Sequence, residues 1–387
     1  MAIDSQRRAT IVEALKASQL QALATVSPQE VLLLTGYWPV MGASLALVTR
    51  DGEVCAVVPE DELDLARATS NANVTTYQPH SLDNLLKCSE ALIEPLKRLT
   101  ARLHLSSDQI GMDLRASLQP GSYLATNQFR ASISQIFFTV LPGAAVVSAD
   151  CMLDRLKSAK TAVEIAQIRH ASRLTASAFA EAERAIVPGR REDEVAADIG
   201  AAFARIAGEG FARGYGYFFC MSGPNSAKAA AAYARTRRRV IKESDLVMIH
   251  ANTVGDGYWT DITRTFVAGN PSGEQKKMHE AVAEAHAAAL AAIAPGVSAK
   301  LVDKAARDVL KEHGFGAEFK HATGHGVGFA AANPDAMPRV HPLSPDVLTA
   351  GMTFNIEPAI YIDGAGGMRH CDVVACTESG AEVLTDF

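Results

Sequence analysis

The 387-residue sequence has little that would mark a membrane, secreted or nucleic-acid-binding protein. No apolar run approaches the roughly 18 to 20 residues that span a bilayer, and the N-terminal stretch 1–18 lacks the apolar centre of a signal peptide. We therefore expect a cytoplasmic protein with no membrane partner. The net charge is −6, and the one dense basic run, 235–242, is too short for the basic face that nucleic acid requires, so no such partner is expected.

Cysteine is scarce and follows no pattern. No CxxC pair occurs among the six cysteines. In a chain of this length such scattered residues are typical of reduced cytosolic thiols, and they exclude a disulfide framework as the organising feature. The six are Cys55, Cys88, Cys151, Cys220, Cys371 and Cys376.

What the sequence does contain is enough apolar material for a sizeable core. Hydrophobic residues make up 48% of the chain and charged residues 21%, which is ordinary for a globular protein. At about 150 residues per domain, the length predicts two domains. We place the boundary near residue 150, which gives domains 1–150 and 151–387.

The first part of the chain alternates between helical and strand patterns. An amphipathic helix is predicted at 7–17, and a hairpin at 44–58 around the turn Arg50-Asp51-Gly52. Helical patterns recur over 81–103, and 109–113 has the composition of a short buried strand. These elements indicate a small α/β domain.

The second part alternates between helix pairs and strand pairs. This order indicates two halves of similar build. Helices are predicted at 152–185, 192–211, 274–293 and 298–313. The strand pairs are predicted at 246–250 with 258–267, and at 353–362 with 368–377.

Residues able to bind a metal lie on or between these strand pairs. His250 and Asp261 belong to the first pair, Glu357 and Cys371 to the second, and His325 to a glycine-rich segment between them. Strand residues on one face can converge on a point, and all four residue types are ligands of first-row metals. Any one of them alone is more often a surface or capping residue than a ligand, so the combination carries the interpretation.

Four sequence blocks resemble the creatinase/prolidase/methionine-aminopeptidase family, and most closely its Xaa-Pro aminopeptidase and prolidase branch. The stretch 155–165 resembles the helix that opens the catalytic domain of that family, and 222–227 resembles its substrate-side loop. The four blocks are GDGYWTDITRTF (255–266), HATGHGVGF (321–329), GMTFNIEPAIYI (351–362) and GGMRHCDVV (366–374).

The resemblance implies an α/β (α+β) chain whose C-terminal domain has the pita-bread fold, with two αβ halves around one curved antiparallel sheet. A smaller creatinase-type α/β domain would precede it, which 1–150 fits by order and size only. The resemblance also implies a homodimer.

The family's five metal ligands are Asp, Asp, His, Glu and Glu, and the resemblance carries three of them over unchanged. These are Asp261, His325 and Glu357. His250 stands at the position of the first Asp, and Cys371 at that of the last Glu. The site therefore resembles a two-metal centre from which two carboxylates have been lost.

Charge favours one ion over two in this altered site. Asp261 and Glu357 supply −2, or −3 if Cys371 is a thiolate, against +4 for two dications. We expect a single divalent ion, Zn²⁺, Fe²⁺ or Mn²⁺. His250 would either ligate a second ion or only contact a ligand. The alternative is no metal, as in creatinase, and for Cys371 a buried apolar role.

Within the resemblance, the ion activates a water molecule and Glu357 carries its proton. His321 would bind the substrate and assist catalysis. Tyr233 occupies the position of a family histidine and would share both roles. Arg339 and His341 would bind the carboxylate of a dipeptide.

The sequence therefore predicts a hydrolase of small peptides that cleaves next to proline, as an Xaa-Pro dipeptidase or aminopeptidase. The alternative is a metal-independent, creatinase-like hydrolase of a small amide or amidine, in which His321 or His325 works with Glu357 as an acid/base pair. A third possibility is a non-enzymatic binding module.

Overall fold

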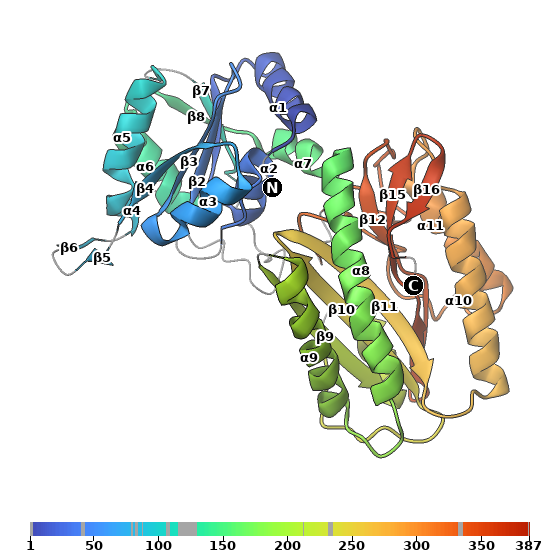
Figure 1. Ribbon diagram of the computed structural model, residues 1–387. Helices are drawn as coiled ribbons and strands as arrows, with labels where there is room; N and C mark the ends of the chain where they lie inside the picture. The colour runs from blue at the N-terminus through green and yellow to red at the C-terminus, as the bar shows by residue number, and fades with distance from the viewer. Residues whose placement is uncertain are drawn as a thin grey trace. The chain divides into compact units, whose positions relative to one another are not determined.

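A computed structural model describes residues 3–39, 43–78, 80–81, 84–86, 88–105, 109–114, 130–211, 213–230, 235–331, 336–385 and 387. The chain forms two compact units, Met1–Lys157 and Ser158–Phe387. The boundary expected after residue 150 lies within helix α7 (Asp150–Ser158), whose first eight residues belong to the first unit (Figure 1). No helix among the described residues is long and apolar enough to cross a bilayer.

The first unit contains a mixed six-stranded sheet. The predicted hairpin is confirmed as the antiparallel pair β2–β3, with Gly52 in the left-handed region (φ 85°) at its turn. The pairs β1–β7, β7–β8 and β3–β4 are parallel. The strand order is β4 (Asn73–Tyr77), β3 (Val54–Pro59), β2 (Leu45–Thr49), β1 (Ala22–Thr25), β7 (Gln109–Met112) and β8 (Ala145–Ser148).

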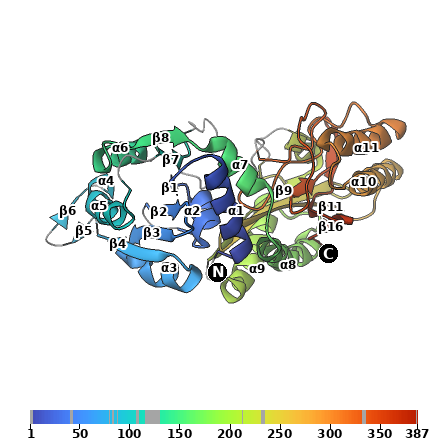
Figure 2. The same ribbon diagram turned by 90° about the horizontal axis from the view of Figure 1, so that it is seen from above.

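Helices of the first unit flank this sheet, and Figure 2 shows α5 and α6 next to each other. Strand β1 was not predicted, because it has only four residues and no alternation of polar and apolar side chains. The helices are α1 (Ser5–Ala17), α2 (Pro28–Thr35), α3 (Leu63–Thr69), α4 (Cys88–Ala91), α5 (Ile93–Arg102), α6 (Arg130–Val140), α7 and the 3₁₀ turn η1 (Glu60–Glu62). A small ribbon joins β5 (His80–Ser81) to β6 (Asn84–Leu85).

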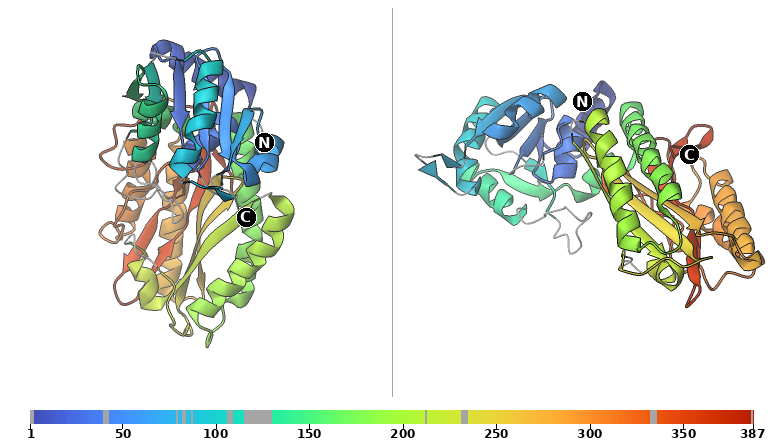
Figure 3. Two further views of the ribbon diagram at one scale, coloured as in Figure 1. Left: turned by 90° about the vertical axis from the view of Figure 1, so that its left-hand side faces the viewer. Right: turned by 60° about the horizontal axis from the view of Figure 1, so that its bottom comes forward.

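The second unit opens with two long helices, α8 (Ala162–Ala185) and α9 (Glu192–Gly210). They cover one face of an antiparallel sheet of β11 (Tyr258–Val267), β10 (Leu246–Gly255) and β9 (Gly214–Ser222), as Figure 3 shows. The single helix predicted at 152–185 is two helices, because Thr161 and Glu164 form a capping box that starts α8.

The second half repeats this plan with α10 (Gly273–Ala291) and α11 (Ala299–Glu312). Both strands of the predicted second pair are interrupted, one at Glu357-Pro358 and the other at His370-Cys371. Proline has no N–H to donate to a ladder, which accounts for the first break. The segments are β12 (Thr353–Ile356), β13 (Ala359–Ile362), β14 (Gly366–Arg369), β15 (Asp372–Thr377) and β16 (Gly380–Val383), and the 3₁₀ turn η2 (Gly223–Ala230) lies beside β14.

The two halves of this unit are joined through their backbones. Thr263 N donates to Cys371 O at 3.2 Å, and Cys371 N donates to Thr263 O at 3.0 Å. The break at His370-Cys371 therefore lies next to β11. The break at Glu357-Pro358 directly follows Ile356, which pairs with Asp372, so it lies beside the first break.

A row of buried threonine hydroxyls connects α8 to the sheet. Thr175 donates to the Ala171 carbonyl, and its oxygen lies 2.6 Å from that of Thr253. Thr253 is in turn 2.6 Å from Thr260. Since Thr175 has already donated its only hydroxyl proton, each hydroxyl must donate in one direction, from Thr260 through Thr253 to Thr175.

Candidate active site

The register of β10 and β11 places the first group of site residues on one face of the sheet. His250 pairs with Thr263, and Asn252 pairs with Asp261. Alternate residues on a strand face the same side, so these four lie on the face opposite the one where Thr253 contacts α8.

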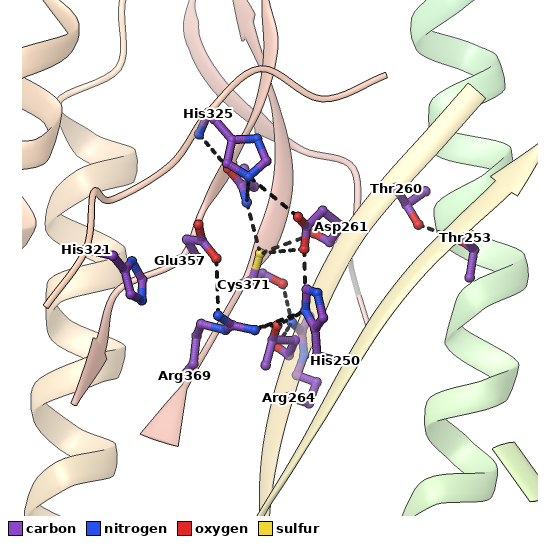
Figure 4. Close-up of polar contacts among 12 residues, drawn as sticks. His250, Thr253, Thr260, Asp261, Arg264, His321, His325, Glu357, Arg369 and Cys371 are labelled. Carbon is purple, nitrogen blue, oxygen red and sulfur yellow. Dashed lines mark hydrogen bonds and ion pairs between the residues drawn. The ribbon is translucent and has the colours of Figure 1, made fainter. Parts of the chain in front are cut away.

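Asp261 is at the centre of the site and is 2% exposed. Its Oδ1 lies 3.6 Å from His250 Nδ1 and 3.9 Å from Cys371 Sγ. Its Oδ2 lies 3.6 Å from His325 Nε2 (Figure 4). The structure therefore brings four of the five predicted ligands together, around one carboxylate.

His325 is held so that one ring nitrogen faces Asp261. Its backbone N–H donates to Asn355 Oδ1 at 2.7 Å, and its Nδ1 lies 3.2 Å from the Gly326 carbonyl. Because Nδ1 faces an acceptor it carries the proton, which leaves a lone pair on Nε2, where Asn355 Nδ2 lies at the long donor distance of 3.4 Å. Gly324 is required here, because a Cβ would lie 1.9 Å from the Asn355 carbonyl oxygen.

Glu357 and Arg369 lie on the second side of the site. Arg369 Nη1 is 3.7 Å from Glu357 Oε2, and both side chains are mostly buried. The guanidinium also donates through Nε to Thr263 Oγ1 at 3.1 Å and through Nη2 to His250 Nδ1 at 3.0 Å. A buried cation therefore connects the two hairpins.

This contact fixes the state of His250. A guanidinium only donates hydrogen bonds, so His250 Nδ1 accepts and its lone pair is occupied. Burial lowers the pKa of His250 to about 4, against the attraction of Asp261. The nitrogen that faces Asp261 is therefore not free to bind a metal in this arrangement.

Cys371 is fully buried, and its sulfur lies 3.2 Å from the Asp261 backbone carbonyl, to which the thiol donates. Asn355 Nδ2 donates to the same sulfur at 3.7 Å. Burial raises the pKa of Cys371 well above its ordinary value, with further contributions from Asp261 and Glu357. As it stands, the residue is a neutral thiol, which is a poor metal ligand.

The donor atoms fit one ion better than two. Two ligands bonded at about 2.1 Å in tetrahedral geometry are about 3.4 Å apart, and Asp261 Oδ2 and His325 Nε2 are 3.6 Å apart. Among the described residues, no three predicted ligands have donor atoms that all lie within 4.8 Å of one another. The charges of Asp261, Glu357 and Arg369 sum to −1. With a second dication the net charge of the site would be strongly positive.

His321 is close to this centre and both its ring nitrogens are engaged. Nδ1 lies 2.7 Å from the Ala322 carbonyl, and Nε2 lies 2.9 Å from the Tyr361 hydroxyl, which donates to it. Burial lowers the pKa of His321 to about 4 and raises that of Tyr361 to about 12. Both groups are therefore neutral at pH 7.

The segment that carries both histidines is anchored to helix α11. Buried Asp303 Oδ1 accepts from the N–H of Thr323 at 3.0 Å and from its hydroxyl at 2.9 Å. Arg307 bonds to Asp303 and donates through Nη2 to the His321 carbonyl at 3.0 Å. This anchor connects a helix to the loop between His321 and His325.

The remaining predicted residues lie elsewhere or outside the described part. Tyr233 is outside the described residues. Arg339 pairs with Asp346 Oδ1 at 2.7 Å, and His341 Nδ1 accepts from the Leu343 N–H at 3.0 Å. The substrate-binding role of these three stays a prediction.

Sequence reasoning missed Asn355, Tyr361 and the Asp303 anchor. Asn355 precedes Glu357 by two residues in the strand predicted at 353–362, so alternation could have placed the two on one face. The pairing of Asp303 with Arg307 is a local i,i+4 contact, but the link to the histidine loop depends on Thr323, which is twenty residues away along the chain.

Comparison with known proteins gives two family matches. Residues 166–378 match the model of metallopeptidase family M24, and residues 7–156 match the creatinase/prolidase N-terminal domain. The dipeptidase PepE of Mycobacterium tuberculosis, itself described as probable, is 38% identical over 240 residues. That match covers 62% of this chain and only 61% of PepE.

Full-length matches come from Pyrococcus. The Xaa-Pro dipeptidase of Pyrococcus furiosus is 29% identical over 380 residues, covering 98% of this chain and 97% of that protein. The crystal structure of the prolidase from Pyrococcus horikoshii superposes with a TM-score of 0.78 at 26% identity, covering 99% and 98% of the two chains. The predicted fold, a pita-bread domain preceded by a creatinase-type domain, is confirmed.

Proposed function

Because the chain belongs to metallopeptidase family M24 and carries a creatinase/prolidase N-terminal domain, we propose that it is a metal-dependent peptidase that cleaves small peptides next to proline. The Xaa-Pro dipeptidase and prolidase names of full-length relatives support this substrate class. The retained Asp261–His325 pair is the observation that carries the proposal.

We assign one divalent ion, Zn²⁺, Fe²⁺ or Mn²⁺, to Asp261 Oδ2 and His325 Nε2, with Glu357 beside them. The ion supplies a bound water of lowered pKa and a Lewis acid for the scissile carbonyl. The tautomer of His325 supports this assignment, because Nε2 carries a lone pair 3.6 Å from Asp261 Oδ2, and an ion would replace only the long 3.4 Å contact with Asn355 Nδ2. His250 acts in the proposal only through its contacts with Asp261 and Arg369.

Glu357 is the group that accepts and returns a proton in this proposal. One of its oxygens faces the Arg369 guanidinium, whose charge holds the carboxylate in place. The substrate carbonyl would be bound by Tyr361 or His321, which hydrogen-bond each other at 2.9 Å. The Tyr361 hydroxyl has a single proton, which it donates to His321 Nε2, so this bond must open before either side chain can bind a substrate oxygen. Tyr233, Arg339 and His341 keep their proposed roles in binding the rest of the peptide.

The experiment compares hydrolysis of Ala-Pro and Ala-Ala by the purified protein and its His325→Ala and Glu357→Gln variants. Metal content is measured by mass spectrometry on protein purified without chelator. We expect cleavage of Ala-Pro only, loss of the ion bound at Asp261 in His325→Ala, and a loss of at least about 100-fold in kcat for Glu357→Gln. His313→Ala, on an exposed histidine of the same unit, is the matched control. Full Ala-Pro activity in metal-free protein would overturn the proposal.

One observation favours the metal-independent alternative, a creatinase-like hydrolase of a small amide or amidine. The buried Arg369 already supplies a fixed cation beside Glu357 and His250. Under this alternative, turnover of a non-peptide amide would be unaffected by chelator, and Ala-Pro would not be cleaved.

We further propose a homodimer and a cytoplasmic location, in line with the family resemblance. Light scattering on the purified protein should give the mass of two chains. Cell fractionation should place the protein with cytoplasmic markers, and recovery in another fraction would contradict this location.

A further inference from the structure

A second cluster of metal-binding side chains lies apart from Asp261. It consists of His286 on α10, His370 between β14 and β15, and Asp372 on β15. Their donor atoms Nε2, Nε2 and Oδ2 all lie within 4.8 Å of one another, and no other such trio occurs among the described residues. Cys371, between His370 and Asp372, faces Asp261, so its two neighbours face the opposite side.

The carboxylate of this trio is fixed in orientation. Asp372 Oδ1 accepts from Arg264 Nη2 at 2.6 Å and from Thr385 Oγ1 at 2.6 Å. Its other oxygen, Oδ2, is thereby directed at His286 Nε2 (3.1 Å) and His370 Nε2 (3.0 Å). A ligating carboxylate whose second oxygen is hydrogen-bonded is the usual arrangement at metal centres.

His286 supplies an independent observation. The residue is 8% exposed, and its Nε2, although near Asp372, has no well-directed hydrogen bond to any described residue. A buried ring nitrogen without a proper partner is uncommon in folded proteins and needs an explanation. The two imidazole rings are edge to face with centroids 4.6 Å apart, and their Nε2 atoms lie 3.1 and 3.0 Å from the same carboxylate oxygen.

The trio is open to solvent on one side. His370 has a side chain 39% exposed, and it lines a cavity of about 460 Å³ between α8 and α10. Arg264, His279 and Glu183 line the same cavity. An ion and its water can therefore reach the trio without passing through the proposed active site.

We propose that His286, His370 and Asp372 bind a divalent transition-metal ion of the Zn²⁺ class, with water from the cavity as the fourth ligand. Two imidazole nitrogens and one carboxylate oxygen are a common zinc donor set. Ligands on one ion are about 3.4 Å apart, so each histidine needs to move from Asp372 by only a few tenths of an ångström. The Arg264 charge opposes binding, so we expect a dissociation constant in the micromolar range rather than the nanomolar.

This site changes how metal content is interpreted. A protein that binds two ions would hold one between Asp261 and His325 and one at the trio, without a two-metal active site. The two positions share no ligand, so substitutions can remove them one at a time.

The test is titration of the metal-free, full-length protein with Zn²⁺ by calorimetry, and with Co²⁺ by visible absorption. Wild type should bind at two sites, and His370→Ala should lose one while keeping Ala-Pro hydrolysis. His286→Gln, which keeps an amide donor toward Asp372, should lose the same site. His279→Ala, in the same cavity but outside the trio, should bind as wild type does.

His325→Ala separates this proposal from the proposed function. It should lose the active-site ion and keep the trio's ion. If His370→Ala and His286→Gln bind Zn²⁺ with unchanged number and affinity, and circular dichroism shows both folded, the trio binds no metal and the proposal is overturned. Loss of Ala-Pro activity in His325→Ala has no bearing on that result.

Discussion

At the scale of single residues, the buried guanidinium of Arg369 distinguishes this site from a cluster of carboxylates alone. It bonds to His250 and Thr263 and lies near Glu357. The sequence motifs predicted that two carboxylates are replaced. They did not predict that His250 accepts a hydrogen bond from Arg369, because that contact joins strands more than a hundred residues apart.

Restoring the two missing carboxylates should restore a second metal position. The double variant His250→Asp/Cys371→Glu adds two negative charges to a site whose net charge is now −1. The larger negative charge favours binding of a second dication. Prepared with His370→Ala to remove the outer trio, it should bind two ions where His370→Ala alone binds one. Mass-spectrometric metal content measures this, and each single substitution is a control. One ion in the double variant would contradict the charge argument.

Cys371 should be unreactive in the native protein. Alkylation needs an exposed thiolate, whereas Cys371 is fully buried with a raised pKa. Cys151 is exposed. Brief iodoacetamide treatment at pH 7.5 followed by peptide mass mapping should label Cys151 and leave Cys371 unmodified until the protein is denatured. Equal labelling of both in the native state would show that Cys371 is accessible.

At the scale of elements, helices were predicted more accurately than strands. The last two helices, expected at 274–293 and 298–313, lie within two residues of α10 and α11. Their caps and their 3.6-residue periodicity are local signals. Strand β9 was missed, because its sequence GYGYFFCMS starts with two glycines and has no polar–apolar alternation. The strand breaks at Glu357 and Cys371 depend on pairing with distant segments, which the sequence does not reveal.

The anchor between α11 and the loop from His321 to His325 should contribute far more to the free energy of unfolding than an exposed ion pair on the same helix. Asp303→Ala leaves Thr323 and Arg307 without their buried acceptor, and we expect a loss of about 3 kcal/mol in the free energy of unfolding. Asp308→Ala removes only the exposed pair with Lys304 and should cost less than about 0.5 kcal/mol. Urea denaturation of both variants measures the difference, and equal effects would refute the anchor.

At the scale of the whole molecule, every proposed metal ligand belongs to the second unit. The length of the chain predicted two domains, but the first could be matched to the family only by order and size, because its sequence contains no chemical motif. Its six-stranded sheet instead emerges from pairings such as β1 with β7, which lie far apart in sequence.

Metal should therefore stabilise one unit and not the other. An ion at 100 times its dissociation constant adds about 2.7 kcal/mol to the stability of the unit that binds it. In calorimetry, Zn²⁺ should raise the transition of residues 158–387 and leave that of residues 1–157 unchanged. A double variant lacking both sites, His325→Ala/His370→Ala, should show no shift. Equal shifts of both transitions in wild type would mean that the units unfold together.

The row of buried threonine hydroxyls between α8 and the sheet limits which substitutions its three positions can accept. Valine has the shape of threonine, so Thr253→Val alone leaves the buried Thr260 hydroxyl without its acceptor while Thr175 keeps its bond to Ala171, whereas valine at 175, 253 and 260 together leaves no hydroxyl. The single change is costly and the triple change nearly neutral, so the three positions are epistatic. We expect them to covary among relatives, with all three hydroxyls present or all three replaced, and an alignment rich in single replacements would disprove this.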